Sequence, residues 1–150
     1  MKFATARTNL LVLAFSLCAA ASVLAADNAF RSAAGGVMIK DLQMGQGPGA
    51  VAGQVATMHF IGWIDEKGAR GREIYNSRAQ GRPVSFVIGD DGVMQGWNEG
   101  VLGMRPGGAR MLLVPPGMAY GRRQVDEAIP ANASLMFRIE LIALEEAPAH

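Results

Sequence analysis

Residues 134–144, SLMFRIELIAL, form the most regular stretch in this chain of 150 residues. Apolar residues recur there at a period of two, which places them on one face of an extended strand: Leu135, Phe137, Ile139 and Leu141. A strand with one apolar face must bury that face against another element. We therefore predict a β-strand over residues 134–144, with a core on its apolar side.

Short β-type runs separated by glycine-rich turns precede this strand. Residues 45–53, GQGPGAVAG, have the composition of a loop. The other expected strands cover residues 37–42, 54–64, 84–88 and 110–114, with a weaker one at 73–77. This spacing predicts a mainly antiparallel sheet.

One segment has the pattern of a helix, residues 92–102, GVMQGWNEGVL. Val93, Trp97 and Val101 are four residues apart and share one helical face. Asp90 or Asp91 is placed to cap the start of this helix. A sheet covered by a single helix is an α+β architecture.

Composition excludes several classes of protein. Half of the residues are hydrophobic, enough for an ordinary core and too many for a disordered chain. A formal net charge of +1 provides no basic surface for nucleic acid. One cysteine and two histidines offer neither an internal disulfide nor a protein-ligated metal site, so we expect no metal and no cofactor.

Residues 1–25 have the pattern of a secretory signal peptide. Lys2 and Arg7 precede an apolar run that begins at Leu10 and ends in small residues. A retained anchor is the alternative, but the run is shorter than the ~20 residues that a spanning helix needs. We expect cleavage, no membrane span afterwards and export to the periplasm, with secretion or the cell surface as alternatives.

The remaining chain divides into a flexible leader at residues 26–35, one domain at 36–146 and a tail at 147–150. Sequence motifs of nucleophilic, metal-dependent and phosphate-binding enzymes are absent, including GxSxG, HExxH and GxGxxG. His59 lies in an expected strand and is interpreted as structural or solvent-facing. Arg122 and Arg123 are interpreted as an exposed loop pair.

Four ordered motifs carry a resemblance. They are VATMHFIG at residues 55–62, MQGWNEGV at 94–101, PPGMAYG at 115–121, and Ile129-Pro130 followed by ASLMF at 133–137. In order and spacing the chain resembles the FKBP-type peptidyl-prolyl cis-trans isomerases over residues 36–145. The resemblance implies a curved antiparallel sheet of about five strands wrapped around one short α-helix.

The resemblance also implies an apolar pocket between sheet and helix. By position, the catalytic residues would be Phe60, Trp97, Tyr120 and Phe137. The substrate-binding residues would be Ile74, Tyr75, Val84, Val93, Met94 and Ile129. The Tyr120 hydroxyl and the Met94 backbone N–H would hold substrate carbonyls.

The implied activity is isomerisation of X-Pro bonds during folding of exported proteins, by desolvation in this pocket. The alternative is a non-catalytic or weakly catalytic module that binds proline peptides or acts as a chaperone, favoured by Tyr75, which stands where the family carries Asp. Expected partners are proline-containing polypeptides, unfolded exported proteins and macrolide inhibitors, and no nucleic acid. The leader is too short for the dimerisation arm of other exported members, so we expect a monomer.

Overall fold

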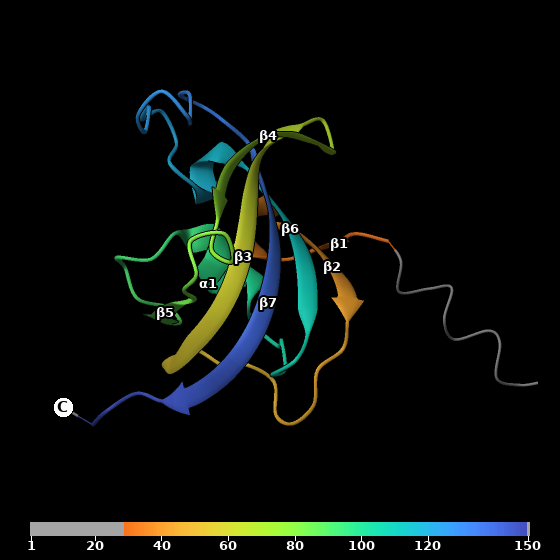
Figure 1. Ribbon diagram of the computed structural model, residues 1–150, viewed down its shortest axis with the longest axis vertical. Coiled ribbons are helices and arrows are strands. Elements are labelled where there is room, and N and C mark those ends of the chain that lie inside the picture. The colour runs from red at the N-terminus through yellow and green to blue at the C-terminus, as the bar shows by residue number, and fades with distance from the viewer. Residues whose placement is uncertain (1–28, 150) are drawn as a thin grey trace, which may run out of the picture.

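An antiparallel sheet of seven strands dominates the computed structural model, which describes residues 29–149. The expected signal peptide lies outside the described residues. Strand order is β1-β2-β6-β7-β3-β4, with β5 paired to β3 (Figure 1). The strands are β1 (Arg31–Ser32), β2 (Met38–Gln43), β3 (Gln54–Glu66), β4 (Ala69–Asn76), β5 (Val84–Val87), β6 (Ala109–Val114) and β7 (Leu135–Glu146).

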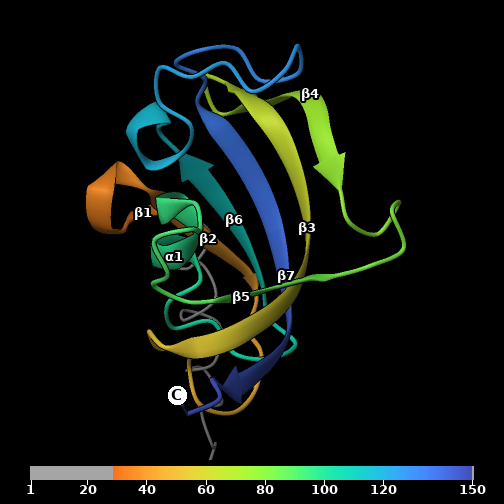
Figure 2. The ribbon, with the colours of Figure 1, turned by 90° about the vertical axis from the view of Figure 1, so that its left-hand side faces the viewer.

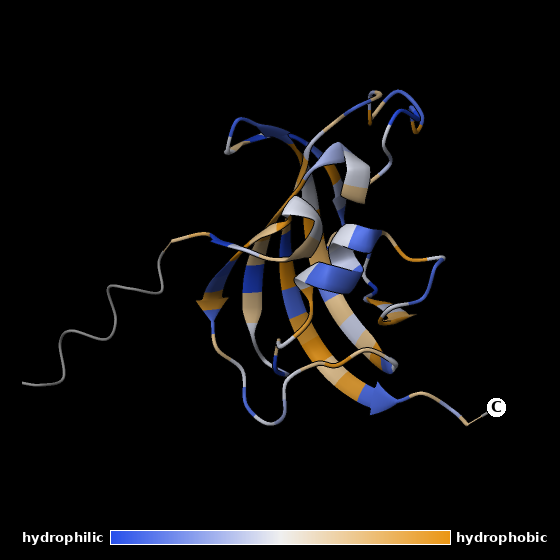
Figure 3. Cartoon of the chain, turned by 180° about the vertical axis from the view of Figure 1, so that it is seen from behind, coloured by the Kyte–Doolittle hydropathy of each residue, from blue (hydrophilic) through white to orange (hydrophobic). Residues whose placement is uncertain are grey.

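The prediction for residues 134–144 is confirmed. The alternating residues of β7 are at most 2% exposed: Leu135, Phe137, Ile139 and Leu141. β7 lies between β3 and β6, and the register places Phe137 between Gly62 and Leu112. Figure 3 shows hydrophobic and hydrophilic residues alternating along the central strands. The period of two therefore identified both the strand and its buried face.

The helix is shorter than expected. α1 covers Gln95–Gly100 and lies against the concave face of the curved sheet (Figure 2). Neither Asp90 nor Asp91 caps it, because Met94 is the residue before its first turn and makes no side-chain cap. The Asp90 carboxylate instead accepts the Gly92 N–H at 2.7 Å. That turn holds the residues before Met94 outside the helix.

Glycines allow α1 to approach the sheet closely. A Cβ atom at Gly96 would lie 2.4 Å from Cγ1 of Val114, and one at Gly100 would lie 2.5 Å from Cδ1 of Leu112. Both contacted side chains belong to β6 and are buried. The small residues at a spacing of four therefore set the distance between α1 and β6.

Gly96→Ala is expected to lower the free energy of unfolding by about 1–3 kcal/mol, because the added methyl group overpacks a close contact. This loss exceeds the gain of about 1 kcal/mol in helix propensity. Urea unfolding measures the difference. Gly117→Ala is the matched control, since a Cβ there meets nothing within 4 Å. Equal stability of the Gly96 and Gly117 variants would contradict close packing of α1.

Two features differ from the expectation. The sheet has seven strands rather than about five, partly because Arg31–Ser32 pairs with Met38 and Ile39 of β2. A 3₁₀ helix follows at Ala34–Gly36, so the expected flexible leader contains regular structure. Two residues are too few for a periodic signal, and pairing to β2 creates this strand.

Among residues 29–149, no helix is both long and apolar enough to span a membrane.

Candidate functional site

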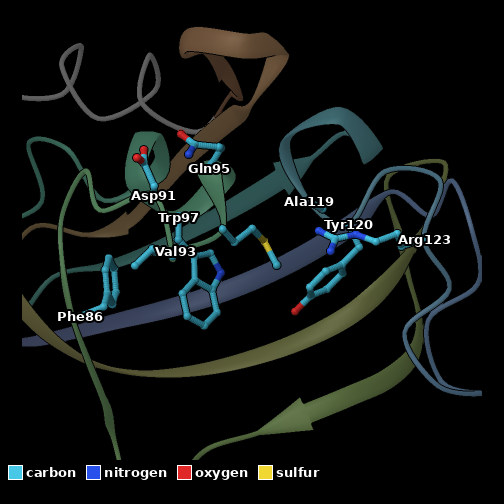
Figure 4. Close-up of a pocket in the computed structure, with 10 residues that line it drawn as sticks. Phe86, Asp91, Val93, Gln95, Trp97, Ala119, Tyr120 and Arg123 are labelled. Carbon is cyan, nitrogen blue, oxygen red and sulfur yellow. The ribbon is translucent and has the colours of Figure 1, made fainter.

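A cavity of about 520 Å³ opens beside the start of α1 (Figure 4). Its apolar lining consists of Phe86, Val93, Met94, Trp97, Ala119 and Tyr120. These residues come from β5, from the segment that enters α1, from α1 itself and from the turn after Pro116–Met118. The cavity is therefore assembled from segments that are distant in sequence.

Trp97 is held by aromatic rings. Its ring centroid lies 4.7 Å from that of Phe60 and 5.6 Å from that of Phe137, both in edge-to-face geometry. Phe86 lies 5.7 Å away in a tilted arrangement. Edge-to-face pairs are favourable because ring edges are positive and ring faces negative. The indole is thereby fixed as the floor of the cavity.

The Trp97 Nε1 atom is buried and has no hydrogen-bond partner within residues 29–149. An unpaired buried donor costs about 1–3 kcal/mol, so such atoms are rare in folded proteins. Among the described side chains no other nitrogen or oxygen atom is in this condition. The cost falls on the residue that forms the cavity floor.

Tyr120 is positioned by a tight turn. Gly121 adopts a φ of +59°, and its N–H donates to the Pro116 carbonyl at 2.8 Å. The Asn132 N–H in turn donates to the Gly121 carbonyl at 2.8 Å. The tyrosine ring points into the cavity in Figure 4. Its hydroxyl makes no hydrogen bond within the described part of the chain, so it is available to a ligand.

The wall behind Trp97 is secured by Ser77. Its hydroxyl accepts the Phe60 N–H at 2.8 Å and contacts Nδ1 of His59 at 2.8 Å, while its own N–H donates to the Phe60 carbonyl at 3.0 Å. Ser77 is fully buried. These bonds tie Phe60 in β3 to the segment after β4, and the contact with His59 gives that histidine a structural role.

The far end of α1 is anchored by a buried arginine. Arg110 donates to the Gly100 and Leu102 carbonyls at 2.9 and 2.8 Å and to Oδ1 of Asp41 at 2.6 Å. Arg31 contacts the other carboxylate oxygen at 2.7 Å. Burial of Asp41 acts to raise the pKa of its carboxyl, but Arg110 and Arg31 outweigh this effect and hold the pKa below its ordinary value. This network fixes the helix that carries Trp97.

The cavity has a more polar lining than the sequence predicted. Asp91, Gln95 and Arg123 also line it. Arg123 is exposed and lies in a loop, as the sequence indicated. Its N–H donates to the Tyr120 carbonyl at 3.1 Å, and the residue is also among those that line the cavity. The turn therefore brings a positive charge next to Tyr120.

The candidate residues divide into three groups. Four of them line the cavity: Val93, Met94, Trp97 and Tyr120. Two lie beneath it, packed against Trp97 at 8% and 2% exposure: Phe60 and Phe137. Four are not among its lining: Ile74, Tyr75, Val84 and Ile129. The structure thus brings Phe60, Trp97 and Phe137 together at and beneath the cavity floor, while the last four residues do not line the cavity.

Tyr75 takes a different position. Its ring stacks on Phe60 with a centroid distance of 4.9 Å and an interplanar angle of 10°, and it is 40% exposed. Phe86 was missed by the sequence analysis, although it lies two residues after Val84 and therefore on the same face of β5. The period of two along β5 was the signal in the sequence that could have identified Phe86.

The chain is similar in sequence to proteins of a known family. Residues 47–142 match the family model of the FKBP-type peptidyl-prolyl cis-trans isomerases. An FK506-binding protein of Neisseria meningitidis serogroup B is 38% identical over 112 residues, which are 75% of this chain and 99% of that protein.

Two solved structures are also similar. The crystal structure of FkpA from Escherichia coli superimposes with a TM-score of 0.70 at 31% identity, covering 79% of this chain and 53% of that one. The crystal structure of AtFKBP13 superimposes with a TM-score of 0.67 at 33% identity, covering 77% of this chain and 98% of that one. Over the aligned part of the chain, the antiparallel sheet and its short helix therefore match the fold of these solved structures.

Proposed function

This chain belongs to the FKBP-type peptidyl-prolyl cis-trans isomerase family, and from that premise we propose that it accelerates X-Pro rotation by desolvating the amide over Trp97. The chain is accordingly a peptidyl-prolyl cis-trans isomerase. Proteins of this family bind proline-containing peptides and FK506-like ligands in general. The observation that carries the proposed mechanism is the Trp97 indole, enclosed by aromatic rings at the cavity floor.

Desolvation favours rotation because of the electronic structure of the amide. Resonance gives the C–N bond a rotational barrier of ~18–20 kcal/mol and places partial negative charge on the carbonyl oxygen. Water stabilises that charge in the planar ground state. The twisted transition state has lost resonance and needs this solvation less, so an apolar floor raises the ground state relative to it. No nucleophile or base takes part in this step.

The substrate is held by polar groups at the cavity wall. The Tyr120 hydroxyl and the Met94 N–H both belong to cavity-lining residues, and neither has a partner within residues 29–149. An unpaired donor beside an apolar floor binds a carbonyl oxygen more strongly than it would in water. These two groups orient the peptide on either side of the proline.

Tyr75 supports a second candidate function, that of a proline-peptide-binding or chaperone module with low turnover. Its ring covers one face of Phe60 and brings no negative charge to that side of the site. A carboxylate there would accept hydrogen bonds as a charged group, whereas a phenol forms only the weaker neutral bond. On this proposal, slow turnover and retained peptide affinity occur together.

A prolyl isomerisation assay on a short peptide tests both candidates. We expect wild-type turnover above the uncatalysed rate, and an increase in kcat/KM of about tenfold for Tyr75→Asp, which corresponds to about 1.4 kcal/mol. We expect this increase because the aspartate brings a negative charge to the site and no longer covers the Phe60 ring. Tyr75→Phe is the control, since it keeps the stacked ring and removes only the hydroxyl.

Different outcomes separate the candidates. Wild-type turnover equal to that in buffer, with peptide binding retained, would reject the enzyme and favour the binding module. A lower kcat/KM for Tyr75→Asp than for the wild type would show that the stacked ring contributes to the site and does not limit it.

Compartment and ligands complete the proposal. Residues 1–25 have the composition of a signal peptide, which supports export to the periplasm and unfolded exported proteins as clients. A relative that matches over 99% of its length bears the name FK506-binding protein, which supports binding of macrolide inhibitors in the same cavity. Amino-terminal sequencing of the exported chain and an FK506 competition assay test these two points.

A further inference from the structure

Two opposite charges line the cavity at separate ends. Figure 4 shows Asp91 and Arg123 on opposite sides of the Trp97 indole. Asp91 precedes the entry to α1, and Arg123 follows the turn that carries Tyr120. A peptide lying across the indole would therefore extend toward a negative group at one end and a positive group at the other.

Neither charge is used to stabilise the fold. Four ion pairs occur among residues 29–149, and they involve only Asp41 and Glu140 as acids. Of the two aspartates at the entry to α1, the structural one is Asp90, which accepts the Gly92 N–H at 2.7 Å. In the described chain, no hydrogen bond or ion pair engages the side chain of Asp91 or Arg123. Both charges therefore remain available to a ligand.

The backbone holds both residues in place even though their side chains are exposed. The Arg123 N–H donates to the Tyr120 carbonyl at 3.1 Å, which keeps the backbone of Arg123 in the turn that carries the tyrosine. At the other end, the Val93 N–H and the Asn98 side chain both donate to the Asp90 carbonyl, at 3.1 and 3.0 Å. The fold thus places the backbone of the two residues at different ends of the cavity.

We propose that Asp91 and Arg123 make this isomerase selective for X-Pro segments that carry a basic side chain on one flank of the proline and an acidic side chain on the other. The inference deepens the proposed function and rests on it. Exposed charge pairs contribute little each, so we expect each end to change kcat/KM by about two- to fivefold at low salt. Salt screens such pairs, and the selectivity should fall as ionic strength rises.

Three peptides of equal length test the proposal. One carries Lys before and Glu after the X-Pro pair, one carries Glu before and Lys after, and one carries Gln at both positions. We expect one charged peptide to exceed the Gln peptide in kcat/KM and the reversed peptide to fall below it. Affinities of the same peptides are measured alongside by titration calorimetry, so the ranking is obtained from binding as well as from turnover.

Charge reversal assigns the ranking to particular residues. Arg123→Glu and Asp91→Lys should each reduce the difference in kcat/KM between the two charged peptides. The double variant should reverse the order of these peptides. Arg122→Glu is the matched control, because Arg122 is the exposed neighbour of Arg123 and does not line the cavity. This control should keep the wild-type ranking.

The outcomes distinguish this inference from the proposed function. Turnover of the Gln peptide with equal kcat/KM and equal affinity for all three peptides would overturn the charge selectivity and leave the isomerase mechanism intact. A ranking altered as much by Arg122→Glu as by Arg123→Glu would also overturn it, since the effect would then come from overall charge. Absence of turnover with the ranking preserved in affinity would support the charge selectivity and reject the mechanism.

Discussion

Replacing Trp97 with leucine is expected to lower kcat/KM for a prolyl peptide roughly a hundredfold, or about 2.7 kcal/mol of transition-state stabilisation. Leucine keeps an apolar residue in α1 but removes the flat surface against which the amide is desolvated. It also breaks the edge-to-face contacts with Phe60 and Phe137, so the floor loses its fixed orientation. The isomerisation assay measures kcat/KM, and thermal unfolding verifies that the variant is folded.

Trp63→Leu is the matched control for this variant. Trp63 belongs to a separate apolar cluster with Met111 and Met136, and the Arg70 guanidinium lies 4.7 Å from the centre of its ring. Loss of a tryptophan there should affect stability and leave kcat/KM close to wild type. A folded Trp97→Leu protein with wild-type kcat/KM would mean that catalysis does not take place over the indole.

Asp41→Asn is expected to lower the free energy of unfolding by about 3 kcal/mol, because it leaves the buried Arg110 guanidinium without its counter-charge. Arg110 also holds the Gly100 and Leu102 carbonyls, so the end of α1 should loosen. Urea unfolding at neutral pH measures the loss. Arg31→Ala is the control, since that partner is 55% exposed and should contribute less than about 1 kcal/mol.

The same pair predicts an acid limit to stability. The pKa of Asp41 is lowered in the folded state, so its contribution is present above the ordinary aspartate pKa of about 3.9 and is lost as pH falls through the folded value. Glu140 acts in the same direction, since a hydrogen bond from Arg78 lowers its pKa. Asp41→Asn should therefore unfold with a weaker dependence on pH below about 4. Equal pH profiles for variant and wild type would contradict a role for this carboxylate.

A local pattern was sufficient for β7. A period of two is a property of neighbouring residues, so it identified β7 and its buried face without any knowledge of the partners. Ordered motifs were sufficient for the family, because they record the spacing of whole segments. Even so, the predicted helix is too long, because Gly92 and Val93 fit a helical pattern but are held in the turn made by Asp90.

The composition of the cavity depended on tertiary structure. Phe86, Trp97, Tyr120 and Arg123 meet only because β3 and β7 curve around α1 and because glycines bring that helix close to β6. Phe60 and Phe137 lie beneath the indole for the same reason. Their sequence motifs alone predicted that they belong to the pocket.

Sequence by itself determined the long strand β7 with its buried face, the presence of a helix around Trp97 and the family of this protein, since each is encoded in local period or in ordered motifs. Only the tertiary structure decided that Tyr75 stacks on Phe60 and that opposite charges flank Trp97. Pairing of β3 with β4 brings Tyr75 beside Phe60, and the packing of loops from distant parts of the chain around α1 brings the charges to the cavity, so neither arrangement is contained in a single segment.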